Sequence, residues 1–298
     1  MDTFSDRARA AALARGMLAR ISKTKTGRTA AANTINRKRM VLNNAMEYAC
    51  EIGALTENPL RLVKWTRPRT LTAVDPRVVI NTEQARRFLA PVAALGERGD
   101  RLMVFFALMY YAGLRPEEAT ELRRMNLTHL PEEPDEWGEM QLTHAQPRSG
   151  SRWTESGKVR EQSPLKHRAK GDTRRVPIHP ELVGLLRDHL EQYVAGAPES
   201  RVFSSLAGGP VTDRMYLRVF HEARAAAFTE AEAASPLMDV PYSLRHAAVS
   251  TWLRSAGDPV QVAEWAGHSV VVLLRVYAKC VHGAEAETLR RIWDSTRA

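Results

Sequence analysis

The sequence predicts a mostly α-helical protein with a small antiparallel β-sheet, an α+β fold divided into two domains. Apolar residues recur at helical spacing over most of the chain, whereas three short runs between residues 139 and 178 have the composition of strands. The length of 298 residues suits one or two domains with at least one large core. Residues 1–70 carry fourteen Lys and Arg against five Asp and Glu, while the remainder carries 29 of each.

The composition also excludes several classes of protein. The longest apolar run, residues 102–114, is too short to span a bilayer, and the N-terminus lacks the pattern of a secretory signal. Cys50 and Cys280 form neither a disulfide framework nor a metal-ligand spacing, so we expect no bound metal. No phosphate-binding glycine loop, zinc motif or serine hydrolase elbow is present, so we expect no cofactor. A cytoplasmic protein without a membrane partner is therefore expected.

A short helical domain is expected over residues 1–70. A helical face runs through residues 34–52 and ends at Gly53, and a weaker helix covers residues 6–21. The positive charge indicates a surface for a polyanion, and nucleic acid is favoured over membrane because no Trp- or Phe-rich amphipathic face accompanies it. The candidate DNA-binding residues lie between the helices and at the start of the second: Lys23, Lys25, Arg28, Arg37, Lys38 and Arg39.

A linker over residues 71–81 is expected to lead into a second domain over residues 82–298. Its first helix begins at Thr82, and Pro91 is expected to end or kink it. A buried helix follows over residues 102–112, and Pro116 starts the next one.

The middle of this second domain is expected to form the sheet. Strand-like runs cover residues 139–146, 163–168 and 173–178, and the last two are expected to pair as a hairpin across residues 169–172. Between the first two runs lies a polar loop, residues 147–162. From Pro180 onward the pattern is helical, with helices expected at residues 180–194, 212–231, 243–256, just after 259, 270–279 and 285–293.

Three segments of the second domain carry residues suited to catalysis. They read Gly-Leu-Arg115-Pro-Glu-Glu118, Tyr242-Ser-Leu-Arg245-His246, and Ala-Gly-His268-Ser with Tyr277 nine residues after the histidine. Each segment also has a plain structural interpretation. Arg115 suits a surface cation, Arg245 and His246 suit a solvated helix start, His268 suits a helix cap, and Tyr277 suits a core aromatic.

Taken together, the segments resemble the motifs of the tyrosine recombinase, or phage integrase, family. That family carries a G-L-R-x-x-E segment ending a buried helix, an H-x-L-R-H box, and an L-G-H-S box with a tyrosine nine residues on. The segments here read GLRPEE, YSLRH and AGHSVVVLLRVY, in the same order. The resemblance covers residues 82–295, and residues 34–60 resemble the last part of the family's core-site DNA-binding domain.

The resemblance implies an integrase-type enzyme that cleaves and rejoins DNA through a 3′-phosphotyrosyl intermediate. Arg115, Arg245 and His268 would bind the scissile phosphate, Tyr277 would be the nucleophile, and the supporting residues would be Glu118, which orients Arg115, and His246. Guanidinium groups suit the extra negative charge on the non-bridging oxygens. The covalent intermediate conserves bond energy, so neither ATP nor metal is needed. The implied partners are double-stranded DNA of the nucleoid, three further copies of the chain in a homotetramer, and accessory DNA-bending proteins.

The general acid and one position of the second box are less uniform. A lysine on the expected hairpin would protonate the leaving 5′-oxygen, and Lys166 at the strand end is favoured over Lys170 in the turn. Tyr242 stands where the family has the first histidine of its H-x-L-R box, which keeps a hydrogen-bond donor but loses a base titrating near neutrality. Tyr242 is expected to donate to the phosphate held by Arg245.

Two other functions remain compatible with the sequence. The first domain has room for two or three helices where the family usually has four or more, so a non-catalytic DNA-binding remnant is one alternative. A type IB topoisomerase-like enzyme, which nicks and closes DNA by similar chemistry, is the other.

Overall fold

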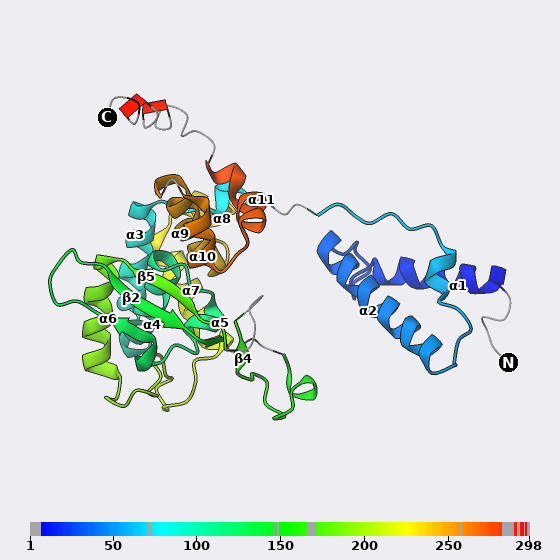
Figure 1. Ribbon diagram of the computed structural model, residues 1–298, viewed down its shortest axis with the longest axis horizontal. Coiled ribbons are helices and arrows are strands. Elements are labelled where there is room, and N and C mark those ends of the chain that lie inside the picture. The colour runs from blue at the N-terminus through cyan, green and yellow to red at the C-terminus, as the bar shows by residue number, and fades with distance from the viewer. Residues whose placement is uncertain are drawn as a thin grey trace. The chain divides into compact units, whose positions relative to one another are not determined.

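The computed structural model describes residues 7–70, 73–145, 147, 149–165, 171–256, 258–281, 289–290, 293–294 and 296. Clustering of the backbone contacts divides the chain into two compact units, Met1–Thr72 and Ala73–Ala298 (Figure 1). We call them unit 1 and unit 2 and describe each by itself. In the described residues, no helix is both long and apolar enough to cross a bilayer.

Unit 1 consists of two α-helices and one turn of 3-10 helix. Helices α1 (Arg7–Ile21) and α2 (Ala32–Glu51) lie close to the bounds that the sequence predicts, and the 3-10 turn spans Pro59–Leu62. A small core forms where Ala14, Leu18 and Leu60 are buried together. The basic loop between the helices folds back on itself, with Thr24 N–H donating to the carbonyl of Arg28 at 2.7 Å.

Unit 2 begins with two helices whose bounds differ from those expected. Helix α3 (Thr82–Ala93) starts at Asn81, which forms a capping box with Gln84, and α4 (Gly96–Tyr111) starts before the apolar run. The expectation that Pro91 ends the helix was wrong, because α3 continues to Ala93. A proline removes only its own N–H bond, and the buried Leu89 and Val92 keep this last turn packed.

Aromatic rings join these two helices to α7 (Asp213–Ala227). Phe88 of α3 lies 5.5 Å from Phe106 of α4 and 5.4 Å from Phe220 of α7, measured between ring centroids. Phe105 and Phe106 have no exposed surface. This cluster forms the centre of the main core, and it fixes the end of α4, from which the first catalytic motif continues.

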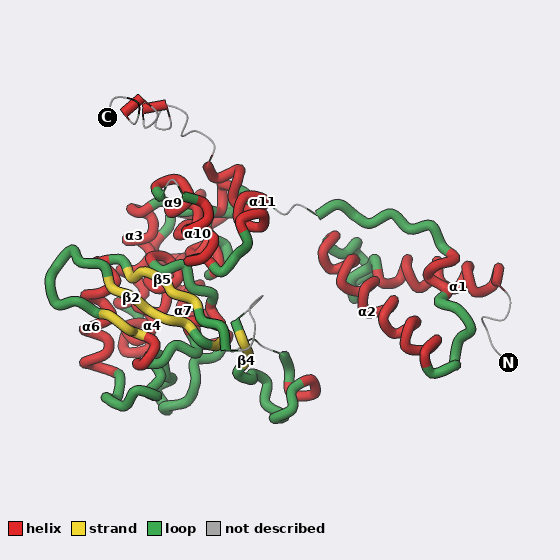
Figure 2. Tube along the Cα trace, viewed as in Figure 1, coloured by secondary structure: helices red, strands yellow, loops and turns green. Residues whose placement is uncertain are grey.

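The sheet of unit 2 has three antiparallel strands in the order β1-β2-β5. The strands span Leu127–His129, Gly138–Leu142 and Arg174–Ile178, and β1 was not expected. In β2 and β5 alternate residues are buried, so Met140, Leu142, Val176 and Ile178 join the main core (Figure 2). A separate pair is formed by β3 (His144–Ala145) and β4 (Ser163–Pro164).

The expected hairpin between residues 163–168 and 173–178 was therefore wrong. Strand β5 pairs with β2, with Leu142 opposite Arg174, whereas β4 pairs with β3. Pro164 has no N–H to donate, so the 163–168 run is a poor interior strand. The apolar face of β5 instead completes the buried face of β2.

The second half of unit 2 is helical, as the pattern from Pro180 predicts. Helices α9, α10 and α11 enclose a second small core that contains Val249, Val262, Leu273 and Tyr277. The helix expected over residues 285–293 lies mostly outside the described residues. The remaining helices are α5 (Pro116–Ala119), α6 (Pro180–Tyr193), α8 (Glu230–Ala234), α9 (Tyr242–Ser255), α10 (Pro259–Ala266) and α11 (Val270–Val281).

Candidate active site

Arg115 lies at the start of the one-turn helix α5, directly after the buried helix α4. The chain turns at Gly113, whose φ of 57° is in the left-handed region that favours glycine, and a Cβ there would lie 2.9 Å from the Trp252 ring. Pro116 takes the first helical position, where its missing N–H leaves no bond unmade. The Glu118 carboxylate accepts the backbone N–H of Arg115 at 2.8 Å, which folds its side chain back over that residue.

Two guanidinium groups meet at the Glu118 carboxylate. Arg115 Nη1 donates to Oε1 at 2.7 Å. Arg174 donates from Nη1 to Oε1 at 2.9 Å and from Nη2 to Oε2 at 2.7 Å. Burial raises the pKa of Glu118, but the positive charges of Arg174, Arg115 and Arg245 outweigh it and hold the pKa well below its usual range. Glu118 is therefore ionised at neutral pH.

Arg245 joins the cluster from α9 and has no exposed surface. Its guanidinium donates to the carbonyls of Gly113 and Ala266. Its Nη2 also lies 3.2 Å from Nε2 of His268. Arg245 thus links the end of α4 to the end of α10 and lies beside the histidine of the third motif.

His268 follows the C-terminal end of α10. Gly267 has a φ of 62°, and the His268 N–H donates to the Ala263 carbonyl at 2.9 Å, which closes the helix end. Arg115 Nη2 donates to the Gly267 carbonyl at 3.1 Å. Burial, together with the charge of Arg245, lowers the pKa of His268 to about 3, so the imidazole is neutral at pH 7.

Tyr277 lies on α11 with its side chain directed into the same cluster. Its hydroxyl lies 3.1 Å from Nδ1 of His246, and its ring stacks on His268 with centroids 6.0 Å apart. Burial raises the pKa of Tyr277, while the positive charge of Arg245 acts in the opposite direction. Burial and Arg245 lower the pKa of His246 to about 4, so His246 is neutral and able to accept a proton.

Both the tyrosine and Arg245 are covered in this structure. Each has a relative exposed area of 0%. A DNA phosphodiester reaches the Tyr277 hydroxyl only after α11 moves away from α9 and α10 or the tyrosine side chain rotates. The structure thus has the candidate residues assembled but closed to a macromolecular substrate.

Tyr242, which replaces the family's first box histidine, begins α9 and is half-buried. Its ring centroid lies 5.9 Å from the Arg245 guanidinium carbon and 5.0 Å from the His246 ring centroid. The spacing of three residues therefore brings Tyr242 next to Arg245, as the sequence predicts.

The two candidate lysines cannot be located in the same way. Lys166 and Lys170 both fall in the connection between β4 and β5, and this connection lies outside the described residues. The structure describes Arg174, at the start of β5, which the sequence analysis missed. A signal was present: alternation along the strand puts Arg174 on the same side as Val176 and Ile178, and an arginine on a buried strand face is unusual.

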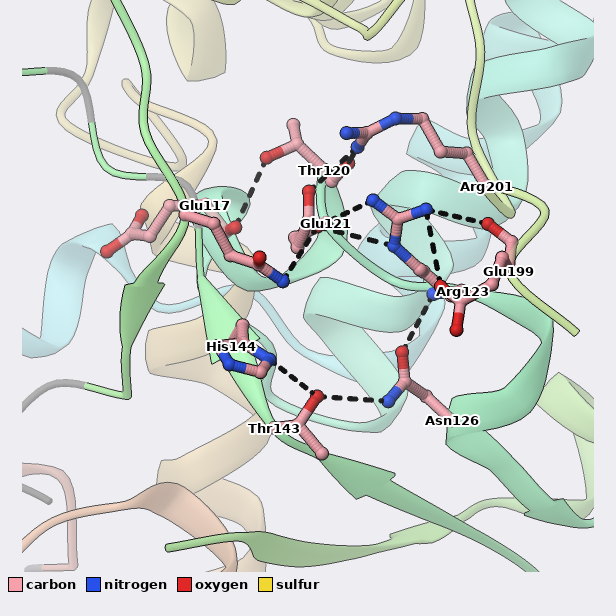
Figure 3. Close-up of polar contacts among 10 residues, drawn as sticks. Glu117, Thr120, Glu121, Arg123, Asn126, Thr143, His144, Glu199 and Arg201 are labelled. Carbon is pink, nitrogen blue, oxygen red and sulfur yellow. Dashed lines mark hydrogen bonds and ion pairs between the residues drawn. The ribbon is translucent and has the colours of Figure 1, made fainter. Parts of the chain in front are cut away.

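A second polar cluster was also missed, and it lines a cavity of about 220 Å³ that borders Glu118. Figure 3 shows its centre, the buried Glu121 carboxylate, between two guanidinium groups. Arg123 lies 3.0 Å from one Glu121 oxygen and Arg201 lies 2.8 Å from the other. Gln162 Nε2 donates to Glu121 at 3.4 Å, which anchors the chain just before β4. The cluster thereby holds the entry to the lysine-bearing connection.

The candidate DNA-binding residues of unit 1 divide into exposed and engaged side chains. Lys25, Arg28 and Arg37 are exposed. Lys38 Nζ donates to the Lys23 carbonyl at 2.8 Å. The Arg39 guanidinium lies 4.4 Å from the centre of the Trp65 ring, in a cation–π contact. The exposed three are therefore the ones whose charges are available to a polyanion without rearrangement.

The arrangement in unit 2 suits chemistry on an anion. Three guanidinium groups, from Arg115, Arg174 and Arg245, surround one carboxylate, which leaves an excess of positive charge in a buried site. Fixed positive charge in a site that excludes water stabilises developing negative charge strongly. A phenol and two neutral imidazoles lie against the same cluster. The group of side chains is therefore equipped for attack by a tyrosine oxygen on a phosphodiester.

Comparison with known proteins gives matches of structure but not of sequence. No protein-family model and no curated protein matches the chain. The Tn1549 transposon integrase in complex with transposon right end DNA superposes with a TM-score of 0.64 at 16% identity, covering 100% of this chain and 87% of that one. The same integrase with a circular intermediate DNA gives 0.61 at 17% identity, with coverage of 97% and 86%.

A site-specific recombinase gives a similar result. XerH bound to its difH substrate, in a pre-cleavage complex, matches with a TM-score of 0.56 at 16% identity, covering 97% of this chain and 70% of that one. The chain thus has the fold of these integrases and recombinases. The predicted α+β class is confirmed, and so, at the level of fold, is the resemblance to tyrosine recombinases.

Proposed function

From this shared fold we propose that the chain is a site-specific DNA recombinase of the tyrosine type, which cleaves and rejoins duplex DNA through a 3′-phosphotyrosyl intermediate. One observation carries the proposal: residues from three distant motifs, Arg115, Arg245 and His268 with Tyr277, meet in one buried cationic cluster. A core aromatic and scattered surface cations would not require this convergence.

The proposed cleavage step exchanges one phosphate ester for another. The Tyr277 oxygen bonds to phosphorus, the bond between phosphorus and the 5′-oxygen breaks, and the 3′-phosphate stays on the tyrosine. His246, whose Nδ1 lies 3.1 Å from the hydroxyl, accepts the phenolic proton in this scheme. A lysine, Lys166 or Lys170, gives a proton to the leaving oxygen. Attack by the 5′-hydroxyl of another strand reverses the step and joins the two DNA molecules.

The cationic side chains stabilise the pentacoordinate phosphorus. Arg115 and Arg245 offer guanidinium donors to the non-bridging oxygens, whose negative charge grows in the transition state. His268 is neutral in the DNA-free form, and a bound phosphate raises its pKa because it adds negative charge next to the imidazole. Protonated His268 then donates to the same phosphate. Tyr242 contributes a neutral donor beside Arg245.

The buried tyrosine gives this function a conformational step. Because Tyr277 has a relative exposed area of 0%, cleavage follows an opening of the contact between α11 and the rest of the cluster. DNA that enters the site supplies the anion that the arginines lack, and this favours the open form. A homotetramer on paired DNA sites, assisted by DNA-bending proteins, is the assembly in which exchange would occur.

Covalent capture tests the function on whichever DNA the protein selects in the cell. Cells that express the chain are lysed in denaturant, the protein is immunoprecipitated, and DNA that remains attached is sequenced. We expect covalent DNA with ends clustered at one or a few related sequences. Recovery of no covalent DNA would support the non-catalytic remnant, and ends scattered without sequence preference would support the topoisomerase-like alternative.

A further inference from the structure

We infer that Arg174 is a positioning residue of the proposed reaction, which saturates Glu118 and holds the end of α10 so that Arg115 and His268 face the phosphate together. The inference rests on the proposed function and extends it to a residue outside the three motifs. Arg174 is 2% exposed, so it acts through its neighbours rather than on DNA.

The hydrogen bonds at Glu118 form a complete set. The two carboxylate oxygens accept four N–H groups: the backbone and Nη1 of Arg115, and Nη1 and Nη2 of Arg174. A carboxylate has about four lone-pair sites, so its capacity is filled. Arg115 uses one side-chain N–H on Glu118 and one on the Gly267 carbonyl. Of the five N–H groups of its guanidinium, the others stay available for phosphate oxygens.

Arg174 also occupies the space beneath the end of α10. Its Nη1 lies 3.5 Å from the Ala266 carbonyl. A Cβ built on Gly267 would approach the same Nη1 to 2.4 Å. Only glycine leaves room for the guanidinium there, and Gly267 directly precedes His268. Arg174 therefore determines the position of the helix end that carries the histidine.

The charge balance explains why two arginines must share the carboxylate. With Arg174 present, Glu118 divides its charge between two guanidinium groups, and the positive charges of Arg115 and Arg245 remain in excess for the phosphate. Without Arg174, the whole Glu118 charge acts on Arg115 and competes with the phosphate for it. The effect of losing Arg174 should therefore depend on the charge of Glu118.

A double-mutant cycle tests this dependence. The rate of single-turnover cleavage of a nicked DNA substrate carrying the captured sequence is measured for the wild type, Arg174→Gln, Glu118→Gln and the double variant. We expect Arg174→Gln to slow cleavage about ten- to a hundredfold, as for the loss of hydrogen bonds to a charged group. In the Glu118→Gln background the same change should slow it by less than about threefold, because no carboxylate charge is left to balance. DNA affinity should be unchanged.

Controls separate positioning from general damage. Arg175→Gln alters the next residue of β5, whose side chain is 72% exposed and paired with Glu139, and it should cleave at the wild-type rate. Arg174→Lys keeps the charge but contacts one carboxylate oxygen instead of two, and we expect a loss of about tenfold in a folded protein. This variant decides the question if Arg174→Gln does not fold.

Three outcomes would overturn the inference. They are an equal loss of rate for Arg174→Gln in both Glu118 backgrounds, wild-type cleavage by Arg174→Lys, and wild-type cleavage by a folded Arg174→Gln. Absence of any covalent product from the wild-type protein is a separate result, which would overturn the proposed function and this inference with it.

Discussion

At the scale of single residues, the site is an unbalanced electrostatic cluster. Arg245 and Arg174 are among the largest fully buried side chains of the described residues, and Glu118 is the carboxylate that holds Arg174 and Arg115. Burying positive charge without a full set of counterions costs stability. Such a cost is typical of a binding or catalytic site rather than of a structural core. The same charges depress the pKa values of both histidines.

The histidines give a pH dependence of stability whose sign follows from these shifts. The pKa falls from 6.5 to about 4 for His246 and from 6.5 to about 3 for His268 in the folded protein. The unfolded chain takes up these protons first, so the stabilisation is complete above pH 6.5 and is lost as the pH falls toward the folded values. Each histidine contributes a slope of about 1.4 kcal/mol per pH unit in that window.

Urea unfolding at a series of pH values checks this prediction. Between pH 6.5 and about pH 4, the His246→Gln variant should lose less stability with falling pH than the wild type does. His221→Gln, which changes a histidine outside the cluster, should keep the wild-type slope. Parallel curves for wild type and His246→Gln across that window would show that His246 is not held neutral.

At the scale of elements, the sequence predicts the helices well and the strand pairing poorly. Helical periodicity is a local signal, and the bounds of α2, α6 and α9 lie within about two residues of those expected. Pairing is set by which buried faces match in space, and residues 163–168 and 173–178 carry no record of this match. Arg174 escaped notice for the same reason, because its carboxylate partner lies 56 residues earlier in the chain.

The site was predictable to the extent that its residues lie in short motifs. Arg115, Arg245, His268 and Tyr277 are recognisable from spacing, and the structure brings all four together. Tertiary contacts without a motif were not predictable. The Glu121 cluster, which ties three segments far apart in the sequence, is an example. The burial of Tyr277 against His246 is another, since it depends on how α11 packs on α9.

The connection between β4 and β5 supports a prediction about the general acid. Loss of that lysine should slow cleavage by about 10² to 10⁴, because the 5′-oxygen is a poor leaving group without a proton. A 5′-bridging phosphorothiolate needs no proton and should restore cleavage by Lys166→Ala. Lys170→Ala serves as the matched control and should cleave both substrates like the wild type. Rescue of Lys170→Ala and not of Lys166→Ala would assign the role to Lys170.

At the scale of the whole molecule, charge and chemistry are separated along the chain. The positive excess lies in residues 1–70, whereas the catalytic motifs lie in unit 2, whose overall charge is close to balanced. Sequence-independent attraction to phosphates and the reaction on one phosphate therefore depend on different units. Affinity and cleavage rate should respond to different substitutions.

Salt dependence of DNA binding tests that division. The triple substitution Lys25→Gln, Arg28→Gln and Arg37→Gln removes three exposed cations of unit 1. The slope of log K against log salt should become shallower by about 0.9 for each phosphate that is no longer neutralised, with the cleavage rate at saturating protein unchanged. Arg187→Gln with Arg218→Gln alters two cations of unit 2 that are paired with carboxylates, and it should keep the slope. An unchanged slope for the triple variant would remove these residues from the DNA interface.

The central claim, that Tyr277 forms the covalent bond to DNA, is tested most directly by identifying the modified residue. The protein is trapped on a nicked duplex of the captured sequence, digested with nuclease and protease, and analysed by mass spectrometry. We expect the nucleotide phosphate on the peptide that contains Tyr277. The Tyr277→Phe variant should bind the same DNA with wild-type affinity and give no adduct, since it lacks only the attacking oxygen. An adduct on another residue, or one that persists in Tyr277→Phe, would contradict the claim.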